Sequence, residues 1–130
     1  MSRKYDVVVT NPPYMGSGGM NKKLSEYIRK NYPESKSDLF AVFMEVGMRF
    51  SKESGFTSLI NQQSWMFLSS YEQLRERILK EKMMYSTLHL GPRAFEEIGG
   101  EVVQSTTFVI RNIYIPIFKG IYIRLIKERT

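Results

Sequence analysis

Hydrophobic residues in the first half of the chain show two patterns, a short continuous run typical of a buried strand and a helical spacing. Residues 5–10 (YDVVVT) end in four successive β-branched side chains that would point to both faces, so we predict a strand buried on both faces, as in a parallel sheet. Residues 38–52 are predicted to form a helix with Asp38 as its N-cap. The apolar positions of this helix are Leu39, Phe40, Val42, Phe43, Met44, Val46, Met48 and Phe50.

The second half of the chain continues this alternation. The pattern predicts strands at 56–61, 83–90 and 102–111 and a helix at 69–82. A hairpin is predicted around Lys119-Gly120 from the alternating residues Ile113, Ile115, Ile117, Ile121, Ile123 and Leu125. Right-handed crossovers would make the first three strands parallel. We therefore predict an α/β fold of about four strands with flanking helices and a C-terminal hairpin.

A long polar segment, residues 11–37, separates the first strand from the first long helix. We predict a loop with one short helix at residues 24–30. A loop of this length inside a compact domain is usually functional or disordered. Because α/β sheets bind ligands beyond the carboxyl ends of their strands, Asn11-Pro-Pro-Tyr14 at the start of this segment is a candidate site.

Composition restricts the class of protein. The 130 residues, of which 42% are hydrophobic and 25% charged, suit one globular domain. The chain has neither an apolar run that could span a membrane nor a signal-peptide core, so we expect a cytoplasmic protein without membrane attachment. With no cysteine and one histidine, His89, we expect no metal site and no Ser-His-Asp triad. We expect His89 to be a hydrogen-bonded strand residue and not a catalytic group.

The net charge is +6, and the cations gather in two segments. One segment is the polar loop, whose candidate phosphate-binding residues are Lys22, Lys23, Lys30 and Lys36. The other runs from Arg111 to the C-terminus. Such side chains can contact the phosphates of double-stranded DNA or form solvated surfaces, and charge alone does not separate these alternatives.

Asn11-Pro-Pro-Tyr14 combines groups that suit an amine carried by a planar ring. Two consecutive prolines stop the strand and hold a stiff, extended turn. Such a turn can direct the Asn11 side-chain oxygen and the Pro12 carbonyl toward one –NH2 group, which donates two hydrogen bonds. Tyr14 offers a flat face to the ring. The alternative is a plain turn in which Asn11 caps and Tyr14 packs.

This quartet and the strand before it resemble the catalytic motif of S-adenosylmethionine-dependent amino-methyltransferases, especially N6-adenine DNA methyltransferases. The resemblance spans roughly residues 5–112, because further similar segments follow in order. These are Asp38-Leu-Phe-Ala-Val-Phe-Met-Glu45, GFTSLINQQSW (55–65), Leu90-Gly-Pro-Arg-Ala-Phe95 and VQSTTFVI (103–110). The likeness is greatest to the large adenine methyltransferases of bacterial restriction and phage-exclusion systems.

The resemblance implies roles for individual residues. Asn11 and Pro12 would hold the N6 amine of an adenine flipped out of the duplex. Tyr14 and Phe95 would stack on the two faces of that base. The residues expected beside the cofactor S-adenosylmethionine are Pro13, Leu39 and Phe40.

The resemblance also implies how the chain is organised. The glycine-rich cofactor loop of the family normally precedes the Asn-Pro-Pro-Tyr strand, and only four residues precede that strand here. Residues 1–112 would form the C-terminal half of a Rossmann-like methyltransferase domain, and residues 113–130 a basic tail or hairpin leading toward a target-recognition region. We therefore expect this chain alone to bind the cofactor weakly or not at all and to be inactive.

The expected partners are double-stranded DNA and the remainder of the methyltransferase chain. An uncovered apolar sheet edge could also cause self-association. Two other functions stay open. One is methylation of a protein glutamine, whose amide also offers two N–H groups, and the other is a non-catalytic nucleic-acid-binding module.

Overall fold

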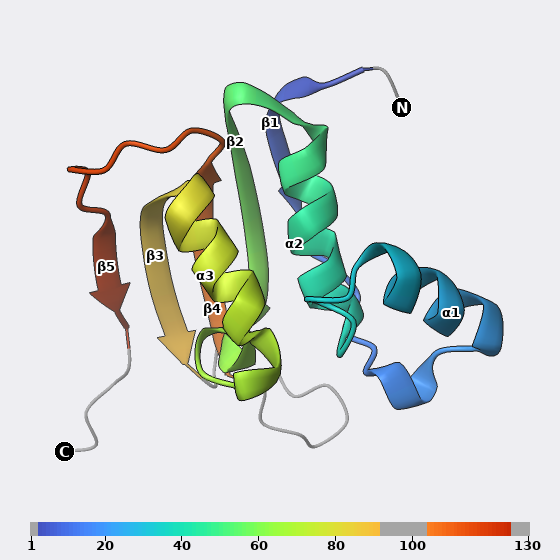
Figure 1. The fold of residues 1–130 in the computed structure, drawn as a ribbon. Coiled ribbons are helices and arrows are strands. Elements are labelled where there is room, and N and C mark those ends of the chain that lie inside the picture. The colour runs from blue at the N-terminus through green and yellow to red at the C-terminus, as the bar shows by residue number, and fades with distance from the viewer. Residues whose placement is uncertain (1–2, 92–103, 126–130) are drawn as a thin grey trace, which may run out of the picture.

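The computed structural model describes residues 3–91 and 104–125, which form one sheet with helices packed on it (Figure 1). The strands are β1 (Tyr5–Thr10), β2 (Ser51–Gln62), β3 (Met83–Gly91), β4 (Ser105–Arg111) and β5 (Ile121–Arg124). The α-helices are α1 (Lys22–Asn31), α2 (Leu39–Phe50) and α3 (Glu72–Glu81). Short 3-10 turns occur at Ser17–Gly19, Gln63–Met66 and Ser69–Tyr71. The predicted α/β class is confirmed, and α1 confirms the short helix predicted within the polar loop.

The five strands form one mixed sheet in the order β1-β2-β4-β3-β5. β1 and β2 are parallel, whereas β4 pairs antiparallel with both β2 and β3. β1, β2 and β3 therefore point the same way, as their crossovers predict, although β4 separates the last two. Their carboxyl ends lie at one edge of the sheet, at the bottom of Figure 1.

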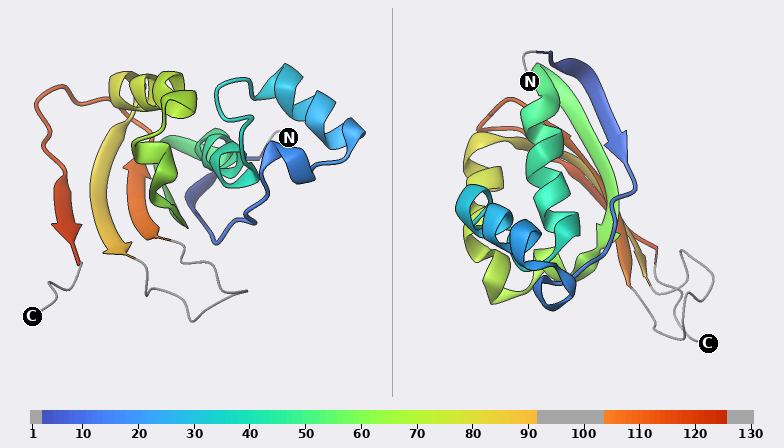
Figure 2. Two further views of the ribbon diagram at one scale, coloured as in Figure 1. Left: turned by 90° about the horizontal axis from the view of Figure 1, so that it is seen from below. Right: turned by 90° about the vertical axis from the view of Figure 1, so that its right-hand side faces the viewer.

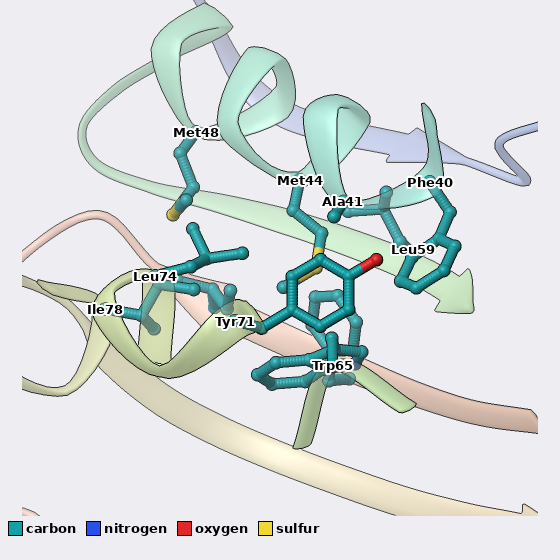
Figure 3. Close-up of a cluster of buried hydrophobic side chains, with 11 residues drawn as sticks. Phe40, Ala41, Met44, Met48, Leu59, Trp65, Tyr71, Leu74 and Ile78 are labelled. Atoms are coloured by element: carbon teal, nitrogen blue, oxygen red, sulfur yellow. The ribbon is translucent and has the colours of Figure 1, made fainter. Parts of the chain in front are cut away.

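The helices lie on one face of the sheet, and no helix of the described residues covers the other face (Figure 2). The main core cluster joins α2 and α3 to β2 and β4, and includes Phe40, Met44, Leu59, Trp65, Tyr71 and Phe108 (Figure 3). Gly47 allows α2 to approach β2 closely, because a Cβ at this position would lie 2.7 Å from Cγ2 of Thr57. The Thr57 hydroxyl also donates a hydrogen bond to the Gly47 carbonyl at 3.1 Å. This close contact fixes α2 on the sheet.

The prediction that the first strand is buried on both faces is wrong for this chain. Val8 faces α2, because its Cγ1 would lie 3.8 Å from a Cβ on Gly47. Val7 and Val9 point to the opposite face, where they are 58% and 71% exposed. The reason is that β1 is an edge strand and its outer face has no helix over it among the described residues. β1 therefore presents an uncovered apolar surface.

Two predicted element assignments at other places are also wrong. No hairpin forms: residues 113–120 contain no strand, and β5 pairs in parallel with β3. Gly120 makes this pairing possible, because a Cβ there would lie 2.1 Å from the Met84 carbonyl oxygen. α2 ends at Phe50 instead of residue 52, and β2 begins directly at Ser51. None of the described helices has the length and apolar character needed to cross a membrane.

Candidate functional site

The end of β1 leaves two hydrogen-bond acceptors without partners. Thr10 is the last paired residue of β1, opposite Leu59, and the two prolines end the ladder there. Asn11 is exposed, and Pro12 is buried. Among the described residues, neither the Asn11 side chain nor the Pro12 carbonyl has a hydrogen-bond partner. The Asn11 side chain and the Pro12 carbonyl are therefore not committed to hydrogen bonds within the described residues.

Tyr14 is held from two sides and remains 36% exposed. Its hydroxyl donates to the Ile60 carbonyl at 3.4 Å. Its ring meets the Phe40 ring edge to face, with centroids 5.8 Å apart and planes at 79°. Burial, and secondly the charge of Asp38, raise the pKa of Tyr14 above its usual value. Tyr14 can therefore offer ring surface to a planar ligand, but its phenol stays protonated near neutral pH.

Asp38 connects the turn after Tyr14 to α2. As predicted, it is the N-cap of α2, and its Oδ1 accepts a hydrogen bond from the Phe40 amide at 3.2 Å. The same oxygen accepts a hydrogen bond from the Met15 amide at 3.0 Å. Sequence reasoning found only the first contact, because capping is local, whereas the second contact joins residues 23 positions apart.

Tyr71 lies behind Phe40, a position that sequence reasoning did not predict. The two ring centroids are 5.9 Å apart, and in Figure 3 the Tyr71 hydroxyl lies on the side of Phe40. Burial, and secondly the charge of Asp38, raise the pKa of Tyr71 to about 12. The charge of Asp38 thus raises the pKa of both Tyr14 and Tyr71. Nothing in the polar sequence SSYEQ around Tyr71 indicates this placement.

The three residues expected beside a cofactor differ in exposure. Pro13 is exposed, Leu39 is half-buried and Phe40 is 1% exposed. Leu39 packs in the cluster that joins α1 to α2, and Phe40 belongs to the main core. Of the three, only Pro13 presents an exposed side chain to a ligand. Contact of these residues with a cofactor stays a prediction.

α1 and the segment after it carry the candidate phosphate-binding cations. Its apolar face, with Ile28 buried, packs against Val42 of α2. The four predicted lysines are all exposed: Lys22, Lys23, Lys30 and Lys36. The Nζ atom of Lys22 lies 3.9 Å from Oε1 of Glu26, and this exposed ion pair contributes little stability. α1 therefore turns its cations toward solvent, which agrees with both a solvated surface and a phosphate-binding role.

Phe95, the second residue expected to stack on a base, lies outside the described residues. As predicted, His89 is a hydrogen-bonded strand residue: it lies in β3, is 5% exposed and has partners on both ring nitrogens. Its Nδ1 lies 3.2 Å from the Tyr122 hydroxyl, and its Nε2 contacts the Gln63 side chain. Burial, and secondly Arg124, lower the pKa of His89. Within residues 3–91 and 104–125, no three Asp, Glu or His side chains gather as metal ligands.

The mixed α/β sheet and the Asn-Pro-Pro-Tyr turn that ends β1 agree with the expected methyltransferase domain. The chain belongs to the Eco57I restriction-modification methylase family, whose sequence pattern matches residues 1–95. This membership confirms the resemblance seen in the sequence.

Two curated relatives are similar over nearly the whole chain. One is the adenine-specific methyltransferase BrxX of Escherichia coli O9:H4 (strain HS), with 50% identity over 128 residues, or 98% of this chain and 11% of BrxX. The other is the adenine-specific methyltransferase PglX of Lacticaseibacillus casei (strain Zhang), with 53% identity over 126 residues, or 97% of this chain and 10% of PglX. The chain therefore spans about a tenth of the length of these relatives.

A crystal structure supports the fold independently. It is that of a provisionally assigned class I S-adenosylmethionine-dependent methyltransferase from Listeria monocytogenes. The TM-score is 0.71 at 15% sequence identity, over 96% of this chain and 38% of the other. At this identity the similarity concerns the fold, and it confirms a methyltransferase-like sheet.

Proposed function

We propose that this chain carries the target-amine side of the active site in a longer methyltransferase that methylates the N6 amine of adenine in DNA. The observation that carries the proposal is the pair of unpartnered acceptors, the Asn11 side-chain oxygen and the Pro12 carbonyl, beside the partly exposed ring of Tyr14. Family membership and the adenine-specific relatives support the same assignment.

The role of this turn in catalysis would be to orient the adenine amine. The amine of adenine is a poor nucleophile because its lone pair is delocalised into the ring. Hydrogen bonds to the Asn11 oxygen and the Pro12 carbonyl would hold both amine hydrogens and favour a pyramidal nitrogen with a directed lone pair. When bound, S-adenosylmethionine supplies an electrophilic methyl group. The nitrogen then loses a proton that alkylation has made acidic, so the turn needs no strong base.

Tyr14 would support the flipped base. A base must leave the duplex to reach a site at the end of β1. The exposed part of the Tyr14 ring can stack on it, while Phe40 and the Ile60 carbonyl keep the ring in place. We expect Phe95 to cover the other face of the base.

The lysines of α1 and the following segment would contact DNA phosphates. Lys22, Lys23, Lys30 and Lys36 are exposed and belong to the segment that follows the Asn-Pro-Pro-Tyr turn. Phosphate contacts contribute affinity that does not depend on base sequence. These residues would therefore hold the duplex beside the site, and selection of the target sequence would come from another part of the enzyme.

The rest of the enzyme would cover the outer face of β1. Val7 and Val9 are exposed there, although strands with apolar side chains on both faces are normally covered on both. The chain spans about a tenth of its curated relatives, so a longer polypeptide could supply this cover. Without it, the same edge could pair with a second copy of the chain.

The proposal is tested with the full-length enzyme and tritium-labelled S-adenosylmethionine. Incubation with duplex DNA should yield labelled N6-methyladenine after digestion to nucleosides. Label found in a protein glutamine, with none in DNA, would support the glutamine alternative. Salt-dependent DNA binding without transfer to any substrate would support the non-catalytic alternative.

A further inference from the structure

The two ends of residues 16–37 are hydrogen-bonded to each other, in a junction that we call the neck. The Ser17 amide donates to the Ser37 carbonyl at 3.0 Å, and the Leu39 amide donates to the Met15 carbonyl at 3.0 Å. Gly16 and Asp38 form an isolated antiparallel bridge between these two bonds. The segment that carries α1 and the four lysines therefore begins and ends directly beside Tyr14.

Residues that follow α1 attach the same segment to the other helices. Glu34 accepts a hydrogen bond from Arg77 of α3 at 2.6 Å, and Arg77 also contacts Glu45 of α2. Ser35 donates to the same Glu45. The 16–37 segment is thus attached to α2 and α3 as well as at the neck.

One atom at the neck holds both neighbours of Tyr14. Met15 follows Tyr14 in the chain, and Phe40 contacts its ring. The amides of these two residues donate to the same oxygen, Oδ1 of Asp38, at 3.0 Å and 3.2 Å. Hydrogen bonds to an ionised carboxylate are stronger than those to a neutral acceptor, so this junction resists rotation of the turn.

We propose that Asp38 is a positioning residue for the target amine: its carboxylate fixes the Asn11–Tyr14 turn on the start of α2. This inference rests on the proposed function for its effect on the reaction rate. Its structural part, immobilisation of the turn, does not depend on that function. The competing explanation is that Asp38 only caps α2.

Three substitutions separate the two explanations. Asp38→Asn keeps an oxygen that can accept from both amides. Asp38→Ser keeps a good N-cap, but its shorter side chain cannot also reach the Met15 amide. Asn21→Ser is the matched control, because Asn21 caps α1 by accepting from the Leu24 amide at 2.9 Å and makes no hydrogen bond to Tyr14 among the described residues.

The first readout is the single-turnover methylation rate of the full-length enzyme at saturating DNA and cofactor. Asp38→Ser should lower this rate by about 10- to 100-fold, the size of effect expected for a displaced reacting geometry. Asp38→Asn should restore most of the rate, and Asn21→Ser should leave it unchanged. A wild-type rate in Asp38→Ser would overturn the proposal.

The second readout is hydrogen exchange of the Met15 amide, which is measurable whether or not the enzyme methylates adenine. Exchange should be fastest in Asp38→Ser, intermediate in Asp38→Asn, whose neutral oxygen accepts a weaker hydrogen bond, and unchanged in Asn21→Ser. Unchanged exchange in Asp38→Ser would overturn the proposal even if its rate fell. If wild type methylates no adenine, the proposed function fails, and the exchange data still decide whether Asp38 immobilises the turn.

Discussion

Tyr14 and Phe40 meet edge to face, with ring centroids 5.8 Å apart, and Phe40 is itself only 1% exposed. The exposed aromatic ring of the candidate turn is therefore set directly against the hydrophobic core. A ligand that stacks on Tyr14 meets a surface whose orientation the core already fixes, so little side-chain entropy is lost on binding.

Substitutions of Tyr14 should separate the role of its ring from that of its hydroxyl. Tyr14→Phe should be mild, because the hydroxyl makes one long hydrogen bond of 3.4 Å to the Ile60 carbonyl. Tyr14→Ala should weaken retention of the flipped base by about 1–3 kcal/mol, the usual contribution of base–aromatic stacking. Fluorescence of 2-aminopurine at the target position reports base flipping. An unaffected Tyr14→Ala variant would reduce Tyr14 to a packing residue.

Tyr71 should make the protein less stable at high pH. Its pKa is about 12 in the folded state, against a usual value of 10.0. The folded state therefore keeps a proton that the unfolded state loses, and this contribution to stability is complete below pH 10 and is lost as pH rises toward 12. The slope is at most about 1.4 kcal/mol per pH unit.

Urea unfolding at several pH values between 10 and 12 measures this slope. Tyr71→Phe cannot titrate at this position and should show a smaller loss of stability than wild type. Tyr27→Phe is the matched control, because Tyr27 is 57% exposed. Parallel profiles for wild type and Tyr71→Phe would contradict the assignment.

Sequence patterns predicted the features of this fold that depend on local chemistry. The N-cap at Asp38 was predicted because capping requires only neighbouring residues, and the end of β1 was predicted because proline cannot continue a ladder. The Asp38–Met15 bond and the placement of Tyr71 were not predicted, because both depend on contacts between distant segments.

The errors have the same physical origin. Apolar alternation in residues 121–125 was assigned to a hairpin, but alternation does not identify the partner strand, and β5 pairs with β3. The apolar pattern of β1 indicates cover on two faces, whereas the described residues cover one. A sequence pattern reflects the surroundings in which a strand is stable, and the described residues do not supply all of them for β1.

The exposed lysines of the 16–37 segment should contribute to DNA binding through charge. Replacing Lys22, Lys23, Lys30 and Lys36 by Gln should lower the slope of log affinity against log salt by about 0.9 for each phosphate that the enzyme no longer neutralises. The control replaces three exposed lysines outside the two cationic segments, Lys4, Lys52 and Lys80. Equal slopes for the two variants would assign the predicted lysines to a solvated surface.

The substitution Val9→Lys should show whether the full-length enzyme covers the outer face of β1. In this chain Val9 is 71% exposed, so Val9→Lys should change stability by no more than about 0.5 kcal/mol. In the full-length enzyme the same lysine should be buried and cost more than about 2 kcal/mol.

Thermal unfolding of both proteins tests the prediction for Val9. Leu79→Lys, at a residue of α3 that is 63% exposed, is the control and should have a small effect in each protein. An equally small effect of Val9→Lys in both would mean that the remainder of the enzyme does not cover β1.

The most direct test of the central claim is single-turnover methylation by Asn11→Ala in the full-length enzyme. The Asn11 oxygen should matter most when the adenine nitrogen becomes pyramidal and positively charged. Its loss should slow transfer by about 100- to 1000-fold, the usual effect of removing a group that stabilises developing charge. Binding of S-adenosylmethionine should remain nearly unchanged, and the control Asn21→Ala should transfer at the wild-type rate. An Asn11→Ala enzyme that methylates adenine at a near wild-type rate would contradict the proposed role of the turn.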